Sequence, residues 1–407
     1  LPELAREEPG DRLPTVVVKA GHVQPIWAGH PWVYAQAIER IDGEAAPGAE
    51  VRVVDRRGQR LGRGLYSPSS AIRVRLFATD VSDVSFDEHL GRALERARLR
   101  RRAWQLPSSD TDAYRLVYAE GDELPGLVID VYGDVCAVQL GTVGMHERRE
   151  RIVQALVAEL APRAIIDRTS VEAARREGFV AGQGVIHGDA ELAELRFRER
   201  GLEFAIPLAL GQKTGFYLDQ RVLRARVEQL ARGRRVLDCY TYVGAVALSA
   251  ARGGASYVRA IDKSEAAIAV ARACAAGNGL TQLEFHAQDA FEALRSVRAD
   301  ERFDLVICDP PKLAPKRSAA PKAVQLMQRL ARAASEATNP GGLVLLSSCS
   351  AALGLNELTR AAALGAREVG VRLTIVERLF QGPDHPVPAA FPEGSYLSSV
   401  LFEATRA

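Results

Sequence analysis

The sequence predicts an α/β fold in which a Rossmann-like C-terminal domain follows an N-terminal β-rich barrel and a central α+β domain. Short β-like runs separated by turn residues fill the N-terminal part, whereas buried strands alternate with helices from about residue 201. A length of 407 residues suits two or three domains. We therefore expect a tail over residues 1–15, a barrel over 16–79, a central domain over 80–200 and the Rossmann-like domain over 201–407.

Composition excludes several classes of protein. With 47% hydrophobic and 26% charged residues, the chain is neither disordered nor a disulfide-stapled miniprotein. Lys and Arg number 53 against 51 Asp and Glu, so a nucleic-acid surface has to be a local patch. Five widely spread cysteines without metal-ligand spacing predict reduced thiols and no metal site. The acidic N-terminus and the turn residues in the longest uncharged stretch predict neither a signal peptide nor a membrane span, hence a soluble, cytoplasmic protein.

Short patterns define the elements of the first two domains. The barrel consists of the runs TVVVK, VYAQAIERI, AEVRVVD, GRGLYS and AIRVRLF, and residues 16–78 hold nine Lys and Arg against five acids. A helix is expected over 86–106, with arginines at positions 92, 96, 98, 100, 101 and 102 that either hold an RNA backbone or form a solvated face. A hairpin turning at Gly133–Asp134, a helix at 147–160, a strand at 164–168 and a hairpin at 195–206 complete the central domain.

In the C-terminal domain, strands and helices alternate. Strands are expected at 235–239, 257–261, 283–286, 303–308 and 343–347, and helices at 245–251 and 266–278. In a doubly wound sheet, ligands bind at the carboxyl ends of the strands.

Three successive strand ends carry an acid. The first strand runs into the loop VLDCYTYVG, which has a single glycine and therefore does not fit the dinucleotide pattern GxGxxG. A phosphate-free nucleoside such as S-adenosylmethionine (SAM) needs no full glycine cradle. The residues expected to contact it are Asp238, Tyr240, Thr241 and Gly244 in this loop, Asp262 at the ribose hydroxyls, Asp289 at the adenine amino group and the Ala290 N–H at a ring nitrogen.

Two further strand ends carry catalytic candidates. The fourth ends in CDPPK, where a rigid turn projects Asp309 towards a planar base, and the fifth ends in SSCS, which contains Cys349. Carbon 5 of cytosine is too weak a nucleophile to attack a methyl group directly, and a thiolate added to carbon 6 activates it. Cys349 is the nucleophile in this interpretation, and Asp309 stabilises charge near ring N3. The alternatives are a buried structural cysteine and methylation of a base nitrogen by the Asp-Pro-Pro turn.

These residues resemble a known family, the bacterial large-subunit (23S) rRNA cytosine-C5 methyltransferases with an N-terminal PUA domain (RlmI-like). The likeness covers nearly the whole chain. Its strongest segments are GQKTGFYLDQR, VLDCYTYVGAVALSAARGGA, VICDPPK, SSCS and DHPVPAAFPEGSYL. The resemblance implies a PUA RNA-binding domain at 16–79 and a class I methyltransferase domain at the C-terminus.

The resemblance also implies roles for individual residues. Cys349 is the implied nucleophile, and Phe216, Asp219, Asp262, Asp289 and Asp309 are implied to surround cofactor and target. Lys213 and Arg221 are expected at RNA phosphates, Phe216 is expected to cover a ring, and Pro310, Lys312 and His385 are expected near the target base.

The sequence thus predicts an enzyme that uses SAM, releases S-adenosylhomocysteine (SAH) and forms 5-methylcytosine in large-subunit rRNA. The substrate is naked rRNA or an assembling subunit, and the enzyme is a monomer or homodimer. Two alternatives stay open: an RNA base-nitrogen methyltransferase, and a SAM-binding ribosome-assembly factor without turnover, for which Val243 and Ala245 in the cofactor loop are the reason.

Overall fold

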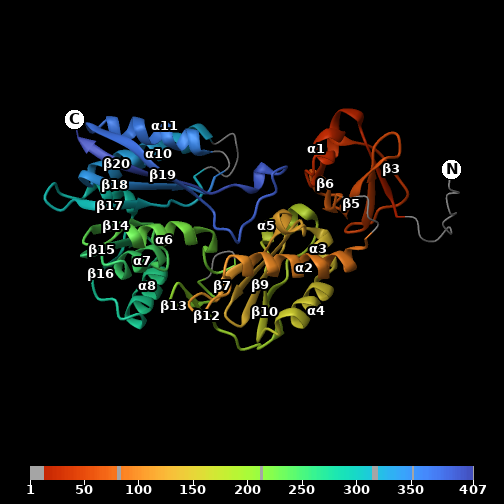
Figure 1. The fold of residues 1–407 in the computed structure, drawn as a ribbon, viewed down its shortest axis with the longest axis horizontal. Helices are drawn as coiled ribbons and strands as arrows, with labels where there is room; N and C mark the ends of the chain where they lie inside the picture. Colours follow the sequence, from red (N-terminus) through yellow and green to blue (C-terminus); the bar gives the residue numbers. More distant parts are fainter. Residues whose placement is uncertain (1–12, 80–83, 211–213, 314–319, 351–352, 407) are drawn as a thin grey trace. The chain divides into compact units, whose positions relative to one another are not determined.

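The structure is a computed structural model that describes residues 13–79, 84–210, 214–313, 320–350 and 353–406. The chain forms two compact units (Figure 1). The first unit comprises Leu1–Ser108, Ala113–Leu192 and Asp384–Gly394, and the second comprises Ser109–Asp112, Ala193–Pro383 and Ser395–Ala407. The chain therefore passes between the units more often than the expected contiguous domains imply, and the hairpin near residue 200 belongs to the second unit.

A six-stranded sheet forms the N-terminal part of the first unit. Its strand order is β2-β6-β5-β4-β1-β3, with strands β1(Thr15–Val18), β2(Trp32–Tyr34), β3(Ile38–Asp42), β4(Glu50–Val54), β5(Arg60–Tyr66) and β6(Ile72–Ala78). Alternating apolar residues such as Val16, Val18, Val51, Val53 and Val74 fill its core. The helix α1(Val23–Trp27) and the 3-10 turns η1(Ala20–His22) and η2(Ala35–Ala37) lie between strands, and the sequence pattern did not predict them.

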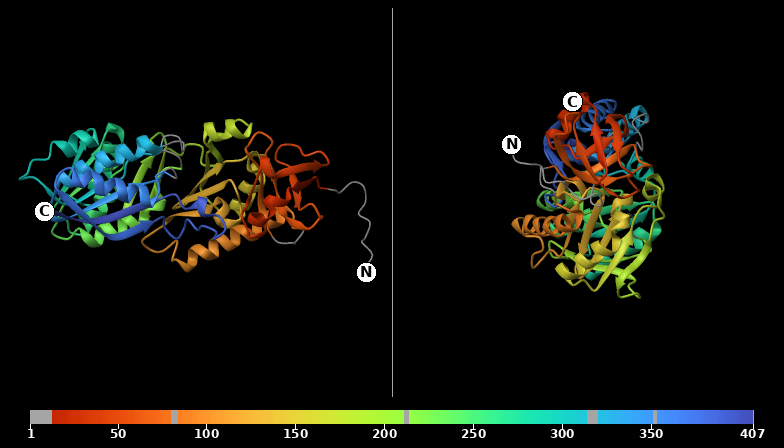
Figure 2. Two further views of the ribbon diagram at one scale, coloured as in Figure 1. Left: turned by 90° about the horizontal axis from the view of Figure 1, so that it is seen from above. Right: turned by 90° about the vertical axis from the view of Figure 1, so that its right-hand side faces the viewer.

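A five-stranded sheet completes the first unit, and Figure 2 shows the chain in two further views. Its order is β11-β10-β9-β8-β7, with β7(Ala113–Tyr118), β8(Leu127–Tyr132), β9(Val135–Leu140), β10(Ala164–Arg168) and β11(Gln183–Gly188). The hairpin with its turn at Gly133–Asp134 is confirmed, because Tyr132 pairs with Val135. The helices are α2(Phe86–Ala103), α3(Val143–Glu147), α4(Arg149–Leu160) and α5(Val171–Glu177), with η3(Ala119–Asp122). Ser85 and Glu88 form a capping box at the start of α2.

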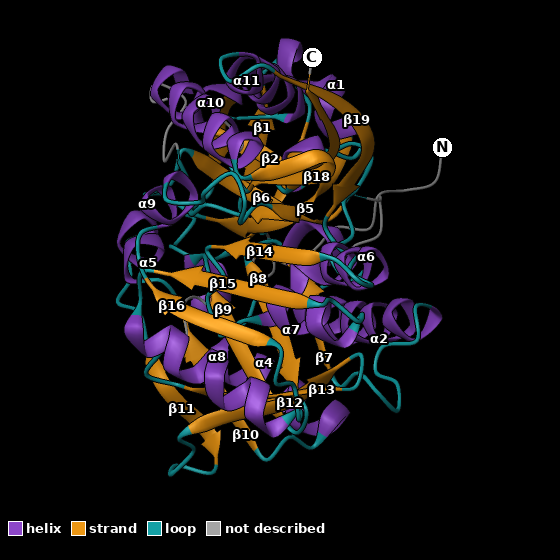
Figure 3. Ribbon diagram, turned by 90° about the vertical axis from the view of Figure 1, so that its left-hand side faces the viewer, coloured by secondary structure: helices purple, strands orange, loops and turns teal. Residues whose placement is uncertain are grey.

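The second unit contains a seven-stranded sheet in the order β16-β15-β14-β17-β18-β20-β19 (Figure 3). Its strands are β14(Arg235–Cys239), β15(Tyr257–Asp262), β16(Leu283–Ala287), β17(Phe303–Cys308), β18(Thr338–Ser348), β19(Val371–Phe380) and β20(Ser398–Arg406). The first five run parallel, and β20 is antiparallel to both of its neighbours. The hairpin β12(Glu194–Glu199)–β13(Leu202–Pro207) forms a separate small sheet.

Helices cover both faces of the seven-stranded sheet. The helices α6(Arg221–Leu230), α7(Ala245–Arg252) and α8(Glu265–Gly277) pack on one face, and α9(Ala290–Arg295), α10(Ala320–Glu336) and α11(Leu355–Arg367) pack on the other. The 3-10 turns η4(Leu218–Gln220) and η6(Pro392–Gly394) complete the element order. The predicted α/β class with a Rossmann-like C-terminal domain is confirmed.

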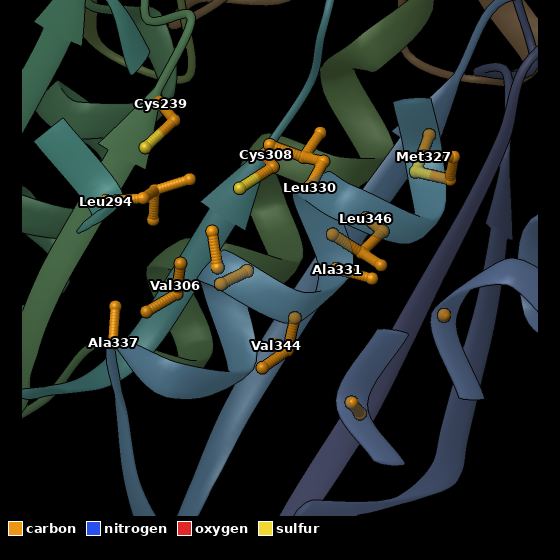
Figure 4. Close-up of a cluster of buried hydrophobic side chains, with 14 of the residues drawn as sticks. Cys239, Leu294, Val306, Cys308, Met327, Leu330, Ala331, Ala337, Val344 and Leu346 are labelled. Atoms are coloured by element: carbon orange, nitrogen blue, oxygen red, sulfur yellow. The ribbon is translucent and has the colours of Figure 1, made fainter. Parts of the chain in front are cut away.

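The buried side chains beneath α9 and α10 include two cysteines (Figure 4). Cys239 and Cys308 are in register on the adjacent parallel strands β14 and β17, and neither is exposed. A hydrogen bond to the Cys308 thiol and burial raise the pKa of the Cys239 thiol well above its ordinary value. Both cysteines are therefore packing residues.

No helix within the described ranges is both long and apolar enough to cross a membrane. The same ranges contain no group of three or more His, Cys, Asp or Glu side chains arranged to hold a metal ion.

Candidate active site

The carboxyl ends of β14 to β18 meet at one edge of the seven-stranded sheet. The register pairs Cys239 with Cys308, Cys308 with Leu346 and Asp262 with Ala287, so the segments that follow these strands leave the sheet side by side. We call this the acidic edge, defined by Asp219, Asp238, Asp262, Asp289 and Asp309. Ligands of doubly wound sheets bind at this place.

The loop after β14 has an uncommon backbone. Tyr240 and Tyr242 have φ of 66° and 53°, in the left-handed region that residues other than glycine rarely adopt. The loop is held by the Thr241 N–H, which donates to the Ile261 carbonyl at 2.9 Å, and by the Tyr242 N–H, which donates to Asp262 Oδ2 at 3.0 Å. Such strain persists where the surrounding structure enforces it, often at functional sites.

Gly244 is the one glycine in the cofactor loop, and packing explains it. Its φ is 81°, and a Cβ there would lie 3.0 Å from Ala271 Cβ and from Leu248 Cδ1. This glycine therefore allows α7 to start close against α8, whereas Val243 and Ala245 on either side are buried.

Asp238 is buried and holds the loop from beneath. Its Oδ2 accepts a hydrogen bond from Thr241 Oγ1 at 2.5 Å. Burial raises the pKa of the Asp238 carboxyl to about 7; the Thr241 hydrogen bond opposes this shift, and the charges of Asp309 and Asp262 add to it. Asp238 and Thr241 bind each other, so the structure assigns them to shaping the loop, and their contact with a cofactor stays a prediction.

The next two strand ends bring three side chains together. Asp262 is half-buried and accepts from the Tyr242 and Ser264 N–H groups, whereas Asp289 is exposed and caps α9 by accepting from Phe291 and Glu292 N–H. Burial raises the pKa of the Tyr240 hydroxyl, and the charges of Asp289 and Asp262 contribute to the shift. Tyr240 therefore lies close to both carboxylates.

The turn η4 joins Asp219 to Asp309 and contains residues that sequence reasoning did not single out. Gln220 Nε2 donates to Asp309 Oδ2 at 2.5 Å. Asp219 accepts a short hydrogen bond from the Tyr396 hydroxyl through Oδ2 and one from the Gly382 N–H through its carbonyl, at 3.0 Å. Gln220 and Tyr396 both lie in segments that carry the family resemblance, so the signal that could have identified them was present.

Asp219 also holds an unpaired oxygen. The residue is 7% exposed, and its Oδ1 is buried without a hydrogen-bond partner among the described residues. A buried carboxylate oxygen of this kind costs free energy unless a donor reaches it. The acidic edge therefore suits a ligand that carries hydroxyl or ammonium donors and positive charge.

Cys349 follows β18 on the same edge and differs from the other cysteines. It is partly exposed, whereas the other four are buried. The serines that precede it form hydrogen bonds with other residues. Ser347 Oγ is hydrogen-bonded to Ser399 Oγ at 2.7 Å, and Ser348 Oγ donates to the Leu353 carbonyl at 3.1 Å. The adjacent strands β17 and β18 both end at this edge. Asp309 directly follows β17, and Cys349 directly follows β18.

Tyr217 lies near both Asp309 and Cys349. Burial raises the pKa of the Tyr217 hydroxyl, and Tyr242, Asp309 and Cys349 add to the shift. The hydroxyl therefore lies near both Asp309 and Cys349, while the ring packs edge-on against Tyr242 with centroids 5.5 Å apart. The structure thus brings the Asp309 carboxylate, the Cys349 thiol and the Tyr217 hydroxyl to the same edge of the sheet.

Phe216, which is expected to cover a ligand ring, packs against aromatic side chains of the protein itself. Phe216 is 5% exposed, and its centroid lies 5.0 Å from that of Phe197 and 5.1 Å from that of Phe204. The Arg224 guanidinium lies 4.6 Å from the same ring. Phe216 is therefore part of the aromatic core under the β12–β13 hairpin.

Two residues expected at RNA are also engaged elsewhere. The buried Glu199 receives the Arg224 guanidinium through both oxygens and Arg221 at 3.7 Å, because a buried carboxylate requires positive partners. His385 belongs to the first unit, where it is 2% exposed and its Nδ1 lies 3.1 Å from Asp384 Oδ1. Arg221 is partly exposed and His385 is buried, so their contacts with RNA stay predictions.

The remaining predicted residues have different positions. Lys312 is exposed after the Asp-Pro-Pro turn, whereas Pro310 and Ala290 are buried. Lys213 lies outside the described residues.

Comparison with known families identifies two parts of the chain. Residues 16–79 match the family of PUA-like domains, and residues 181–402, more than half of the chain, match the family of SAM-dependent methyltransferases. The chain belongs to the SAM-dependent methyltransferases.

Relatives narrow this assignment. The chain is 35% identical to a Klebsiella pneumoniae protein named ribosomal RNA large subunit methyltransferase I, over 95% of this chain and 97% of that one. It is 34% identical to the protein of the same name from Shewanella denitrificans, over 95% and 98% of the two chains. The family is therefore that of large subunit methyltransferase I.

A crystal structure of a protein described as a methyltransferase, complexed with SAH, has the same fold. It covers 96% of this chain and 99% of its own, with a TM-score of 0.81 at 19% identity. The methyltransferase uses SAM as its cofactor, and the strained loop, the strand-end carboxylates and the unpaired Asp219 oxygen fit a cationic nucleoside of this kind.

Proposed function

We propose that this methyltransferase modifies carbon 5 of a cytosine in large-subunit rRNA, with Cys349 as the nucleophile. The observation that carries the proposal is that Cys349 is the partly exposed cysteine at the acidic edge, beside Asp309 and Tyr217. The names of the relatives support rRNA as the substrate.

The cofactor supplies an electrophilic methyl group on a sulfonium. The protein holds it through Asp262 at the ribose hydroxyls, Asp289 and the Ala290 N–H at the adenine, and Asp219 Oδ1 at the ammonium group, while Tyr240 and Gly244 shape the loop. The negative charges of the edge favour the positive ligand. The Cys349 thiol would ionise more readily beside a positive charge.

Cys349 and Asp309 act on the target base. The thiolate would form a bond to carbon 6, and the ring electrons would move to carbon 5, which takes the methyl group as the methyl–sulfur bond of SAM breaks and its electron pair leaves with SAH. Asp309 stabilises the charge that develops around N3, and Gln220 orients its carboxylate through the 2.5 Å hydrogen bond. A base then removes the carbon 5 proton, and the carbon 6–sulfur bond breaks to release the thiolate. Pro310 and Lys312 flank the base.

A second candidate function is methylation of an exocyclic base nitrogen. The Asp-Pro-Pro turn with its oriented carboxylate favours it, because a carboxylate can accept from such an amino group. Cys349 has no chemical role in that reaction, so a cysteine substitution separates the two functions.

The test uses unmodified, deproteinised rRNA and tritiated SAM with the wild type, Cys349→Ala and the matched control Cys308→Ala. We expect label in 5-methylcytidine from wild type and control, and a loss of about 10³-fold or more in Cys349→Ala. Label in another nucleoside, or undiminished label in Cys349→Ala, contradicts the cysteine mechanism. If the wild type methylates neither naked rRNA nor ribosomal subunits, rRNA is not the substrate.

A further inference from the structure

The first unit contains a groove that the proposed reaction does not use. Its volume is about 630 Å³, and it lies entirely within the first unit. The end of β6 forms one wall, helix α2 another, and the segments Glu120–Glu123 and Pro386–Pro388 close the rest. Cavities of this size accommodate ligands in many proteins.

Three arginines of α2 line this groove at a regular spacing. Arg92, Arg96 and Arg100 are four residues apart, so they rise along one face of the helix in steps of about 6 Å. Arg92 is exposed, and the side chains of Arg96 and Arg100 are 45% and 37% exposed. The opposite face of α2, with Leu90 and Leu94, is buried in the core.

The positive charge of Arg100 is not neutralised by its partner. Asp122 accepts from the buried Arg101 through both oxygens, at 2.5 and 2.7 Å, and the same Asp122 Oδ1 also accepts from Arg100 at 2.5 Å. One carboxylate therefore faces two guanidinium groups, which leaves a net positive charge at this end of the groove. The buried Arg101–Asp122 pair fixes the position of this charge.

Two further contacts define the charge of the groove. Arg96 is paired with Glu123 at 2.5 Å, but both side chains are about half exposed, so the pair is weak and can exchange partners. Glu120 accepts from Trp32 Nε1 at 2.7 Å. The described residues give Arg92 no ion pair.

The far wall is tightly built. A Cβ on Gly121 would lie 2.0 Å from the Pro386 carbonyl oxygen, so the backbone of Glu120–Glu123 packs directly on Pro386. Tyr118 donates to the Gly394 carbonyl at 2.7 Å, and Arg101 donates to the Asp384 carbonyl at 2.8 Å. The segment 384–394 is therefore fixed at both ends, and the groove keeps its shape without a ligand.

We propose that this groove binds the phosphodiester backbone of a single-stranded segment of the substrate RNA, with Arg92, Arg96 and Arg100 as the phosphate ligands. The arginine spacing is close to that of successive phosphates in an extended strand, and the guanidinium fork matches phosphate oxygens. The proposal rests on the proposed function, in that RNA is the substrate. It explains why one helix carries both a buried structural arginine and an exposed row.

The test measures binding of polyuridylate and of an rRNA fragment as a function of salt concentration. The test variant is Arg92→Ala/Arg96→Ala, and the matched control is Arg102→Ala, an exposed arginine of the same helix that does not line the groove. We expect the double variant to bind about tenfold more weakly and to lower the slope of log Kobs against log salt by about 0.7 for each arginine. The control should keep the wild-type slope.

A second variant changes the charge in the opposite direction. Glu123→Gln releases Arg96 from its partner and should strengthen binding a few-fold. In methylation assays the double variant should raise KM for RNA while kcat and the cofactor Kd stay at wild-type values.

A double variant with the slope and affinity of Arg102→Ala overturns the groove proposal, whatever reaction the enzyme performs. Arginine-dependent binding without any methylation of rRNA by the wild type would instead overturn the proposed function and leave the groove intact.

Discussion

The acidic edge of the second unit and the groove of the first unit, which Arg92, Arg96 and Arg100 line, carry opposite charges but share one arrangement. In each, one charged group is buried and shapes the site, while others stay partly open to a ligand. The buried groups differ in their partners: Arg101 has Asp122, whereas Asp238 has hydroxyl and amide donors but faces the like charges of Asp309 and Asp262. A buried charge with a counter-ion stays ionised, and one among like charges shifts towards its neutral form.

The largest expected effect comes from breaking the buried pair of the groove. Arg101→Met leaves Asp122 buried with less positive charge and should lower the free energy of unfolding of the first unit by about 3–5 kcal/mol. All three tryptophans (Trp27, Trp32 and Trp104) lie in that unit, so tryptophan fluorescence during urea unfolding reports its stability. Arg102→Met, on the exposed face, should stay within about 0.5 kcal/mol of wild type. An equal effect of both variants would show that the pair does not support the groove.

The next effect concerns Asp238 and depends on pH. Its pKa is raised from the model-peptide value of 3.8 to about 7 in the folded protein, so between these values the folded state holds a proton that the unfolded state has released. The stability of the second unit should therefore fall as pH rises from about 4 to about 7, by up to about 4 kcal/mol. Hydrogen exchange of β14 amides at several pH values measures this, and Asp238→Asn should remove the dependence.

Measurements of kcat test whether Asp309 and its hydrogen-bond partner Gln220 act together. Asp309→Asn should lower kcat by about 10²–10³-fold. Gln220→Ala should lower kcat by about tenfold without changing the cofactor Kd, because Gln220 acts through Asp309. The double variant should be no slower than Asp309→Asn alone, since coupled residues are not additive. Multiplied losses in the double variant would show that Gln220 has a separate role.

The smallest effect is expected at Tyr396, whose hydroxyl donates a hydrogen bond to Asp219 in the turn η4. Tyr396→Phe removes the hydrogen bond to Asp219 and should cost about 0.5–1.5 kcal/mol of stability, with a few-fold loss of kcat. The measurement is a steady-state assay of kcat. The control variant is Tyr257→Phe, because Tyr257 is the first residue of β15 and therefore lies at the end of that strand away from the acidic edge. Equal kcat values in both variants would show that the turn is positioned without Tyr396.

Much of the fold was predictable from local patterns. Strands such as 235–239, 164–168 and 303–308 have the predicted bounds, because a short apolar run between turn signals has few alternatives. The helix α1 was missed because its five residues make little more than one turn, too short to show a repeated apolar pattern. The β12–β13 hairpin was predicted at its position in the chain, but it lies in the second unit and not with the central domain, because sequence order does not reveal packing.

The sequence predicted which residues lie at the strand ends of the candidate site. It did not predict which other side chains the expected ligand-binding residues contact. Asp262, Asp289, Asp309 and Cys349 were located because parallel strands deliver their carboxyl ends to one edge. Phe216 and Arg221 were expected to face ligands, but the aromatic cluster and the buried Glu199 engage them, and neither is visible in the motif that contains them.

By itself, the sequence determined the class of fold and the strand ends that carry Asp262, Asp289, Asp309 and Cys349, since each depends on residues close together in the chain. Only the tertiary structure decided which charges are buried with a partner and which remain open: Arg101 and Arg92 share one helix, and Asp238 and Asp262 end neighbouring strands. The physical reason is that the cost of a charge depends on its solvent exposure and its neighbours, which residues distant in the chain provide.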